Sequence, residues 1–230
     1  MGEETIIKLK KRIKELEKLA RSQETEIREL SALSDRDILT ELYNRRGFVQ
    51  EAEKFLKEAG TLRKITEKRL ISFKDFSVIF IDLDNFKSFN DNYGFEKGDV
   101  IIKETANFII DAVKNHGTVL DMIGHIGGDD FIVVSNPECA ENICLHIIKL
   151  FDENISAYYS DEDRARGYII SKDRLGKVQA FPLMSVSIGI VTNEIRNFTH
   201  YAQLAELAAE VKAVAKEIPK SSYFKDRRKS

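Results

Sequence analysis

One apolar run, Phe76 to Leu83, constrains the fold of this chain more than any other segment. A short apolar run with this composition predicts a strand buried at the centre of a sheet. The run nevertheless delivers two carboxylates, Asp82 and Asp84, at its C-terminal end. Buried charges are costly unless they are paired or bound to a metal ion. The segment therefore predicts a central strand that ends at a functional site.

A β-hairpin is predicted around Gly127-Gly128. Its two strands would be Val119 to Ile126 and Asp130 to Ser135, because paired glycines between two such runs are a hairpin signal. The turn carries a second acidic pair, Asp129-Asp130. Glycines beside it would let a ligand approach the backbone closely.

If this hairpin lies next to the central strand, the carboxylates of Asp82, Asp129 and Asp130 converge at one edge of the sheet. Three hard oxygen ligands suit Mg²⁺, with Mn²⁺ as the alternative ion, and Mg²⁺ also takes oxygens from a bound triphosphate. The competing interpretation is two unrelated acidic turns at the surface. The acidic pairs alone favour that second interpretation.

The rest of the pattern alternates helix and strand, which predicts an α/β (α+β) domain. Four helices and one further strand are expected at Leu42–Ala59, Asp99–Asn115, Pro137–Ile155, Tyr201–Ile218 and Met184–Val191. The second helix should bury Val100, Ile101, Ala106, Ile109, Ile110 and Val113. Residues 167–170 and 177–181 flank a turn and predict an extra hairpin, to which no chemistry is assigned.

The first 34 residues carry a heptad pattern. Isoleucine recurs at position a (Ile6, Ile13, Ile27) and leucine at position d (Leu9, Leu16, Leu30). This choice of residues favours a parallel two-stranded coiled coil. We therefore expect residues 1–34 to form a helix for dimerisation and signalling and residues 35–230 to form the domain, with an upstream sensor domain as a further expectation. The alternative is a lone amphipathic helix packed on the domain.

Composition excludes several classes of partner. The 36 basic residues nearly balance the 38 acidic ones, so no global field attracts nucleic acid or an anionic membrane. No apolar run approaches the ~20 residues of a membrane span, and no signal peptide opens the chain. Cys139 and Cys144 lie on one predicted helix, where no disulfide is expected. These features predict a cytoplasmic protein with reduced thiols.

Several motifs occur in a fixed order. They are Asp37-Ile-Leu-Thr-Glu-Leu-Tyr-Asn-Arg-Arg-Gly-Phe48, Asp82-Leu-Asp-Asn-Phe-Lys-Ser-Phe-Asn-Asp-Asn-Tyr-Gly94, Gly98-Asp99, Gly127-Gly-Asp-Asp-Phe131 and Ser185-Val-Ser-Ile-Gly189. This set resembles the GGDEF family of diguanylate cyclases over roughly residues 35 to 225. The resemblance implies a palm-like nucleotidyl cyclase fold, with a central, mostly antiparallel sheet flanked by helices and preceded by the coiled-coil helix.

The resemblance also implies the catalytic and metal-binding residues. Asp82 and Asp129 would hold Mg²⁺, and the carbonyl of Leu83 would complete the protein ligands. Asp130 stands where the family has a glutamate near the metals and the reacting hydroxyl. The implied reaction joins two GTP molecules into cyclic di-GMP in a homodimer and releases pyrophosphate. Metal ions would clamp the attacking and leaving oxygens.

Substrate contacts are implied at other positions. Backbone amides near Asn85 and Phe86, with the side chain of Lys87, would face the phosphates. Asn90 and Asp99 would read the guanine. A carboxylate can accept from both N1–H and the 2-amino group of guanine, a donor pair that adenine lacks. A site left with unpaired polar groups rejects the wrong base.

The last predicted helix carries Lys212, Lys216 and Lys220, which are spaced by four and would share one face. Lys216 matches the family's phosphate-binding lysine, and Lys220 falls where the family usually has arginine. For Lys212, a solvated basic stripe is an equally good interpretation.

The chain departs from the family pattern at two places. Asp130 replaces a glutamate, so activity is expected but reduced, and the alternative function is a catalytically weak or inactive domain that binds GTP as a sensor or docks a partner. The family's product-inhibition motif, Arg-x-x-Asp, is here Thr118-Val-Leu-Asp121. Its arginine is missing, and His125, taken alone, is mostly neutral at pH 7 and a poor substitute.

Overall fold

The computed structural model describes residues 35–58, 62–66, 69–72, 75–172, 177–194, 198 and 201–228, together with residues 12, 13, 16 and 23. Its elements in chain order are β1 (Tyr43–Asn44), α2 (Arg45–Glu58), β2 (Leu62–Thr66), β3 (Arg69–Ser72), β4 (Ser77–Asp84), α3 (Phe86–Tyr93), α4 (Phe95–His116), β5 (Met122–Gly127), β6 (Asp130–Ser135), α5 (Pro137–Asn154), the 3-10 helix η1 (Ile155–Tyr158), α6 (Asp161–Arg166), β7 (Tyr168–Lys172), β8 (Val178–Pro182), β9 (Ser185–Thr192), α7 (Tyr201–Lys216) and β10 (Ser222–Lys225).

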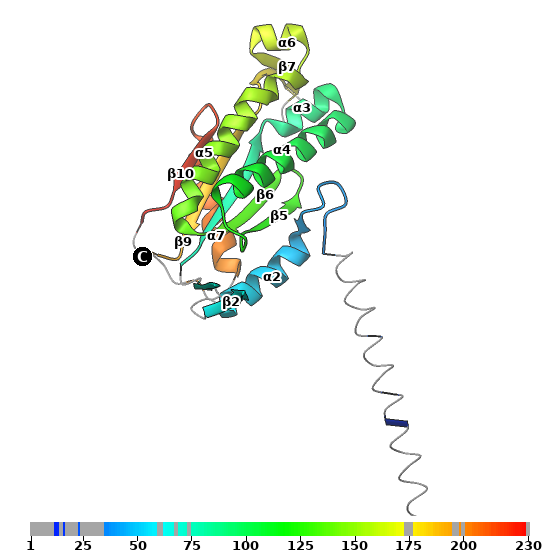
Figure 1. Ribbon diagram of the computed structural model, residues 1–230. Coiled ribbons are helices and arrows are strands. Elements are labelled where there is room, and N and C mark those ends of the chain that lie inside the picture. Colours follow the sequence, from blue (N-terminus) through cyan, green and yellow to red (C-terminus); the bar gives the residue numbers. More distant parts are fainter. Residues whose placement is uncertain are drawn as a thin grey trace, which may run out of the picture.

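A six-stranded sheet in the order β1-β5-β6-β4-β9-β10 forms the centre of the domain (Figure 1). The predicted central strand, β4, pairs antiparallel with β6 and with β9. The β5–β6 hairpin is also antiparallel, and the outer strands β1 and β10 run parallel to their neighbours. The predicted central, mostly antiparallel sheet flanked by helices is therefore confirmed.

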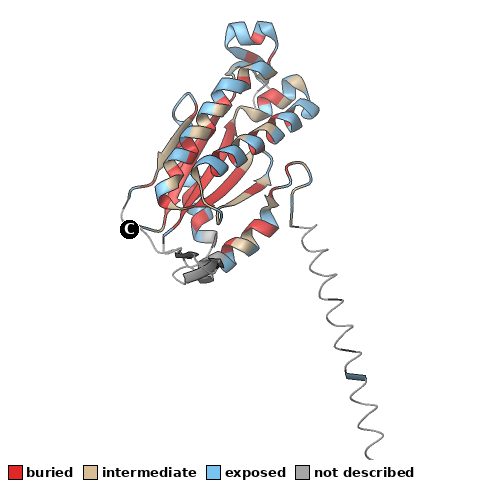
Figure 2. Ribbon diagram, viewed as in Figure 1, coloured by how far each residue is buried: buried red, intermediate tan, exposed pale blue. Residues whose placement is uncertain are grey.

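Side chains of β4 alternate between two hydrophobic cores. Ile79, Ile81 and Leu83 pack with residues of α4 and α5 on one face. Val78 and Phe80 pack with residues of α2 and α7 on the other. Figure 2 shows the strands buried between these two layers of helices. Because strand side chains alternate with a period of two, Asp82 continues the face that α7 covers.

The N-terminal half differs from the predicted elements in several boundaries. Residues Tyr43 and Asn44 pair with β5, so α2 begins at Arg45 rather than at Leu42. The helix predicted from Asp99 begins at Phe95, and a further helix that was not predicted, α3, precedes it. Gly94, with a φ of 86°, separates the two helices.

Three apolar residues lie elsewhere than predicted. Val100 and Ile110 on α4 were expected to face inward, but they are 45% and 40% exposed. The β5 strand begins at Met122, and Val119, predicted to start it, lies in a turn and is 78% exposed. The inward expectation holds for the other four residues, which are Ile101, Ala106, Ile109 and Val113.

The C-terminal half confirms the extra hairpin, since β7 and β8 pair antiparallel. Helix α7 ends at Lys216 rather than at Ile218. The strand β10, which pairs with β9, was not predicted. On α5, Cys139 and Cys144 are free thiols, as expected.

Most of the predicted coiled coil lies outside the described residues. Of its seam positions, Ile13 and Leu16 are described as exposed in this single chain. Among the described helices, none is long and apolar enough to cross a bilayer.

Candidate metal and nucleotide site

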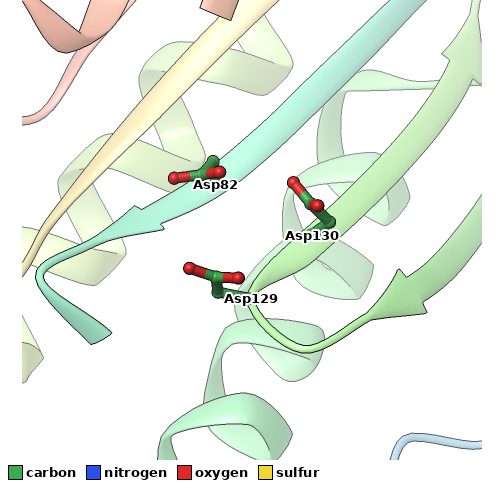
Figure 3. A group of neighbouring side chains, drawn as sticks. All are labelled: Asp82, Asp129 and Asp130. Carbon is green, nitrogen blue, oxygen red and sulfur yellow. The ribbon is translucent and has the colours of Figure 1, made fainter. Parts of the chain in front are cut away.

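Three carboxylates meet where β4 ends beside the β5–β6 turn (Figure 3). Asp82 lies opposite Asp130 in the β4–β6 ladder, and Asp129 comes from the turn. One oxygen from each residue can be chosen so that all three lie within 4.8 Å of one another. The predicted convergence of these side chains is confirmed, and two separate acidic turns are excluded.

The conformation of the turn depends on its glycines. Gly127 and Gly128 have φ values of 135° and 61°, in the region that L side chains rarely adopt. No atom lies within 4 Å of a Cβ built at either position, so backbone freedom rather than space is the requirement. Glycine is therefore the residue that adopts these two backbone conformations with the least strain, and the turn then presents Asp129 and Asp130 beside β4.

Two lysines of α7 reach the acidic cluster. The Lys212 ammonium lies 3.1 Å from Asp82 Oδ1 and also contacts Asp130. Lys216 lies 2.5 Å from Asp82 Oδ2, in an ion pair that is not aligned as a hydrogen bond. Burial lowers the pKa of Lys212, but hydrogen bonding and charge from Asp130 and Asp82 outweigh it and raise the pKa overall. Lys212 is therefore part of the cluster, and the solvated-stripe interpretation is wrong.

The cluster has an unfavourable excess of negative charge close to Asp129. Burial and the charge of Asp82 raise the pKa of Asp129 above its ordinary value. A bound cation would relieve this repulsion. Carboxylate oxygens within 4.8 Å of one another are close enough to share one hard divalent cation such as Mg²⁺. Asp82, Asp129 and Asp130 thus fit the ion in number, chemistry and spacing.

Asp84 links the end of β4 to the neighbouring strand β9. Ser185 and Ser187 on β9 both donate hydrogen bonds of 2.8 Å to its Oδ2. Burial raises the pKa of Asp84, although the two serine hydroxyls oppose that shift. The motif around Ser185, noted in the sequence without a role, thus holds the end of β4 in place.

The start of α3 lies immediately beyond β4. Asn85 adopts a left-handed conformation with a φ of 63° and reverses the chain into the helix. The first N–H groups of a helix have no partner within it and carry partial positive charge. Phe86 packs against the main core, whereas Lys87 is exposed. The side chain of Leu83 is buried, so only its backbone can face a ligand.

Asn90 of α3 packs against Gly98 of α4, the residue before Asp99. A Cβ at Gly98 would come 1.9 Å from Asn90 Oδ1, so the asparagine can pack here only against glycine. Asn90 Oδ1 is buried and has no hydrogen-bond partner among the described residues. Asp99, which follows Gly98 in α4, is exposed. One turn further along α4, Lys103 lines a pocket of about 530 Å³ between this helix and the loop 39–42.

Lys220 does not share the face of Lys212 and Lys216, contrary to the sequence prediction. It is exposed in the turn after α7, where its backbone N–H bonds the carbonyl of Ile218. The helix had been expected to run to Ile218, which would have left Lys220 about one turn beyond Lys216. Its end at Lys216 removes that alignment.

A central antiparallel sheet with an acidic cluster at a Gly-Gly turn, covered by a lysine-bearing helix, defines a nucleotidyl cyclase type of domain. The family model described as "Diguanylate cyclase, GGDEF domain" matches residues 34–221. The chain therefore belongs to the GGDEF-domain diguanylate cyclase family.

Individual relatives support this assignment. A diguanylate cyclase from Vibrio cholerae is 32% identical over 133 residues, covering 56% of this chain and 37% of the relative. Diguanylate cyclase DgcS from Shewanella oneidensis is 37% identical over 82 residues, covering 35% of this chain and 26% of the relative. The matches cover only 10% to 37% of the first curated relatives' own lengths.

A solved structure agrees in fold. The coiled coil and GGDEF domain of DgcB from Caulobacter crescentus, in complex with c-di-GMP, superposes with a TM-score of 0.59 at 17% identity. The match covers 95% of this chain and 99% of that one.

Proposed function

We propose that this chain condenses two GTP molecules into cyclic di-GMP and pyrophosphate as a homodimer. The observation that carries the proposal is the convergence of Asp82, Asp129 and Asp130 beside the N-terminus of α3. Carboxylates placed next to a set of backbone donors suit a metal-bound triphosphate.

Different groups of the protein would bind the metal ion and the phosphates. Asp82, Asp129, Asp130 and the Leu83 carbonyl would hold Mg²⁺ or Mn²⁺, which supplies the charge that stabilises the attacking and leaving oxygens. The N–H groups at Asn85 and Phe86, with Lys87 and Lys216, would orient the triphosphate.

Asp130 would lie near the reacting hydroxyl, as its place in the family pattern implies. Its carboxylate can accept the proton of the attacking 3′-hydroxyl while pyrophosphate leaves. Because Lys212 contacts Asp130, nucleotide binding has to share that carboxylate with the ammonium group or displace it. Lys220, exposed past the helix, would reach only the outer phosphates.

Recognition of guanine would rest on Asn90 and Asp99. Asn90 Oδ1 lies buried against Gly98 without a hydrogen-bond partner among the described residues, so the amide would turn toward the nucleotide to accept from a guanine donor. Asp99 can accept from the adjacent donors of guanine. One domain would hold one GTP, so two domains must face each other.

Incubating the purified chain with GTP and Mg²⁺, followed by chromatography of the nucleotides, tests the proposal. We expect cyclic di-GMP and pyrophosphate, and no product when EDTA removes the metal. GTP binding without any cyclic dinucleotide, at high protein and Mg²⁺ concentrations, would favour the alternative of a GTP-binding sensor or interaction module.

Replacing Asp99 by alanine should weaken GTP binding about 10- to 100-fold and narrow the preference for GTP over ATP, because the donor pair of guanine loses its acceptor. Binding constants for both nucleotides, measured by calorimetry, give the result. Asp91→Ala is the matched control, since Asp91 is an exposed carboxylate on α3. Equal use of GTP and ATP by the wild type would contradict the assignment.

Added cyclic di-GMP should inhibit little through the usual family motif. Asp121, which remains of that motif, accepts hydrogen bonds of 2.6 Å from Thr118 and from Ser135, so both of its oxygens are engaged internally. Burial raises the pKa of this carboxyl despite those bonds.

Progress curves with added product, together with calorimetry, check the expectation. Tight product binding that survives Asp121→Ala would reveal another inhibitory site. Tight binding that Asp121→Ala removes would show that the family motif works without its arginine.

A further inference from the structure

A buried histidine connects the signature turn to the segment that enters the domain. His125 of β5 is 6% exposed and stacks on Phe131 with ring centroids 4.6 Å apart. Its Nε2 lies 3.0 Å from the carbonyl oxygen of Gly128, in the turn. Its Nδ1 lies 3.0 Å from Asp37 Oδ1, a close contact that is not aligned as a hydrogen bond.

Both ring nitrogens thus face acceptors. A backbone carbonyl can only accept a hydrogen bond, and an ionised carboxylate can only accept. A neutral imidazole carries one N–H, so one of its two nitrogens would direct a lone pair at an oxygen. A doubly protonated ring would donate to the Gly128 carbonyl and place a positive charge 3.0 Å from Asp37 Oδ1, so it suits both contacts.

The state of Asp37 supports this form of the ring. Asp37 Oδ1 also accepts from the backbone N–H groups of Leu39 and Thr40 and from the Thr40 hydroxyl, at 3.2, 2.9 and 2.9 Å. Burial raises the pKa of Asp37, but the close contact with His125 and the bonds from Thr40 outweigh it and lower the pKa overall. The carboxyl is therefore held as the anion and cannot supply the missing proton.

No other described neighbour of the His125 ring carries a charge that could take the place of the second ring proton. Asn44 lies opposite His125 in β1, and Phe131 lies opposite it in β6. Within the described part of the chain, Asp37 is the charged residue that contacts the His125 ring. A register shift of the β5–β6 pairing between His125 and Gly127 leaves the turn dependent on such side-chain contacts.

We propose that protonated His125 is a positioning residue, which clamps the Gly127-Gly128 turn to Asp37 so that Asp129 and Asp130 reach their places beside Asp82. The proposal rests on the proposed cyclase function for its effect on rate. Loss of the ring proton would set a lone pair against one of the two oxygens and release the turn. Residues 35–42 directly follow the predicted coiled coil. A change in their conformation would reach the acidic cluster through the contacts of Asp37 with His125 and of His125 with Gly128.

The activity test compares three chains across about pH 5 to 8, the range in which histidine titrates. His125→Arg keeps a cation that does not titrate, and His125→Gln removes the charge. The ratio of the wild-type rate to the His125→Arg rate cancels the pH dependence common to both. We expect this ratio to fall about tenfold as pH rises, and His125→Gln to be slow throughout.

A second measurement does not need turnover. Nitrogen NMR of the intact chain, assigned with His125→Gln, reports whether the ring carries one proton or two. We expect a doubly protonated ring in the range where the rate ratio is high, and a titration midpoint that moves to lower pH in Asp37→Asn. His146→Gln is the control, since His146 lies between α4 and α5, in contact with His116 and Asp111.

A ring that stays neutral over the whole range would overturn the proposal, as would a rate ratio that does not change with pH. If no chain makes cyclic di-GMP, the proposed function fails. The NMR titration and its response to Asp37→Asn then still decide whether His125 is the protonated link.

Discussion

Replacing Asp82 by alanine should lower the rate of cyclic di-GMP formation by about 1,000-fold. Asp82 is 5% exposed, stands opposite Asp130 in the sheet, and holds Lys212 and Lys216 by separate oxygens. Without it, the cluster loses its central metal ligand and both ammonium groups lose a partner. Initial rates at saturating Mg²⁺ measure the effect.

The controls separate chemistry from folding. Asp82→Asn keeps the side-chain shape but not the charge, and it should be nearly as inactive as the alanine variant. Asp91→Ala should keep the wild-type rate. An Asp82→Ala chain that retains more than about a tenth of the wild-type rate would refute the assigned role.

The same assay examines Asp130. Asp130→Ala should be inactive, whereas Asp130→Glu should keep or raise the rate. The extra methylene extends the carboxylate by roughly 1.3 Å, and positional errors near 1 Å can change a rate ~100-fold. The Asp130 side chain is 44% exposed, so a longer side chain has room at this position. A glutamate variant slower than wild type would show that the site is built around the shorter side chain.

Removing residues 1–34 should lower turnover per chain by about 100- to 1,000-fold at about 1 µM protein. Linked domains meet at an effective concentration near the millimolar range, whereas separated domains must meet by diffusion. Turnover per chain should then rise with protein concentration. Rates at several concentrations, with sedimentation of both chains, give the result.

The truncated chain should keep its fold and its affinity for GTP, because the described residues of both hydrophobic cores all follow position 35. The intact chain should sediment as a dimer at micromolar concentration. An intact chain that is monomeric and equally active would show that the N-terminal helix does not serve dimerisation.

Features that depend on local pattern could be predicted from the sequence of this protein alone. The apolar run ending in Asp82 predicted the central strand, and the glycine pair predicted the hairpin that carries Asp129 and Asp130. Both follow from residue type and spacing, because strand periodicity and positive φ angles are properties of neighbouring residues. The order of the motifs along the chain indicated the GGDEF family.

The tertiary structure decided which distant side chains meet. Lys212 and Asp82 are 130 positions apart, and their contact requires α7 to pack on the face of β4 that carries Asp82. The serines on Asp84 and the Asp37–His125 contact also join separate strands or loops. Lys220 does not lie on its predicted face, because α7 ends at Lys216, two residues before the predicted end. Such contacts arise from how elements pack, and no local spacing encodes them.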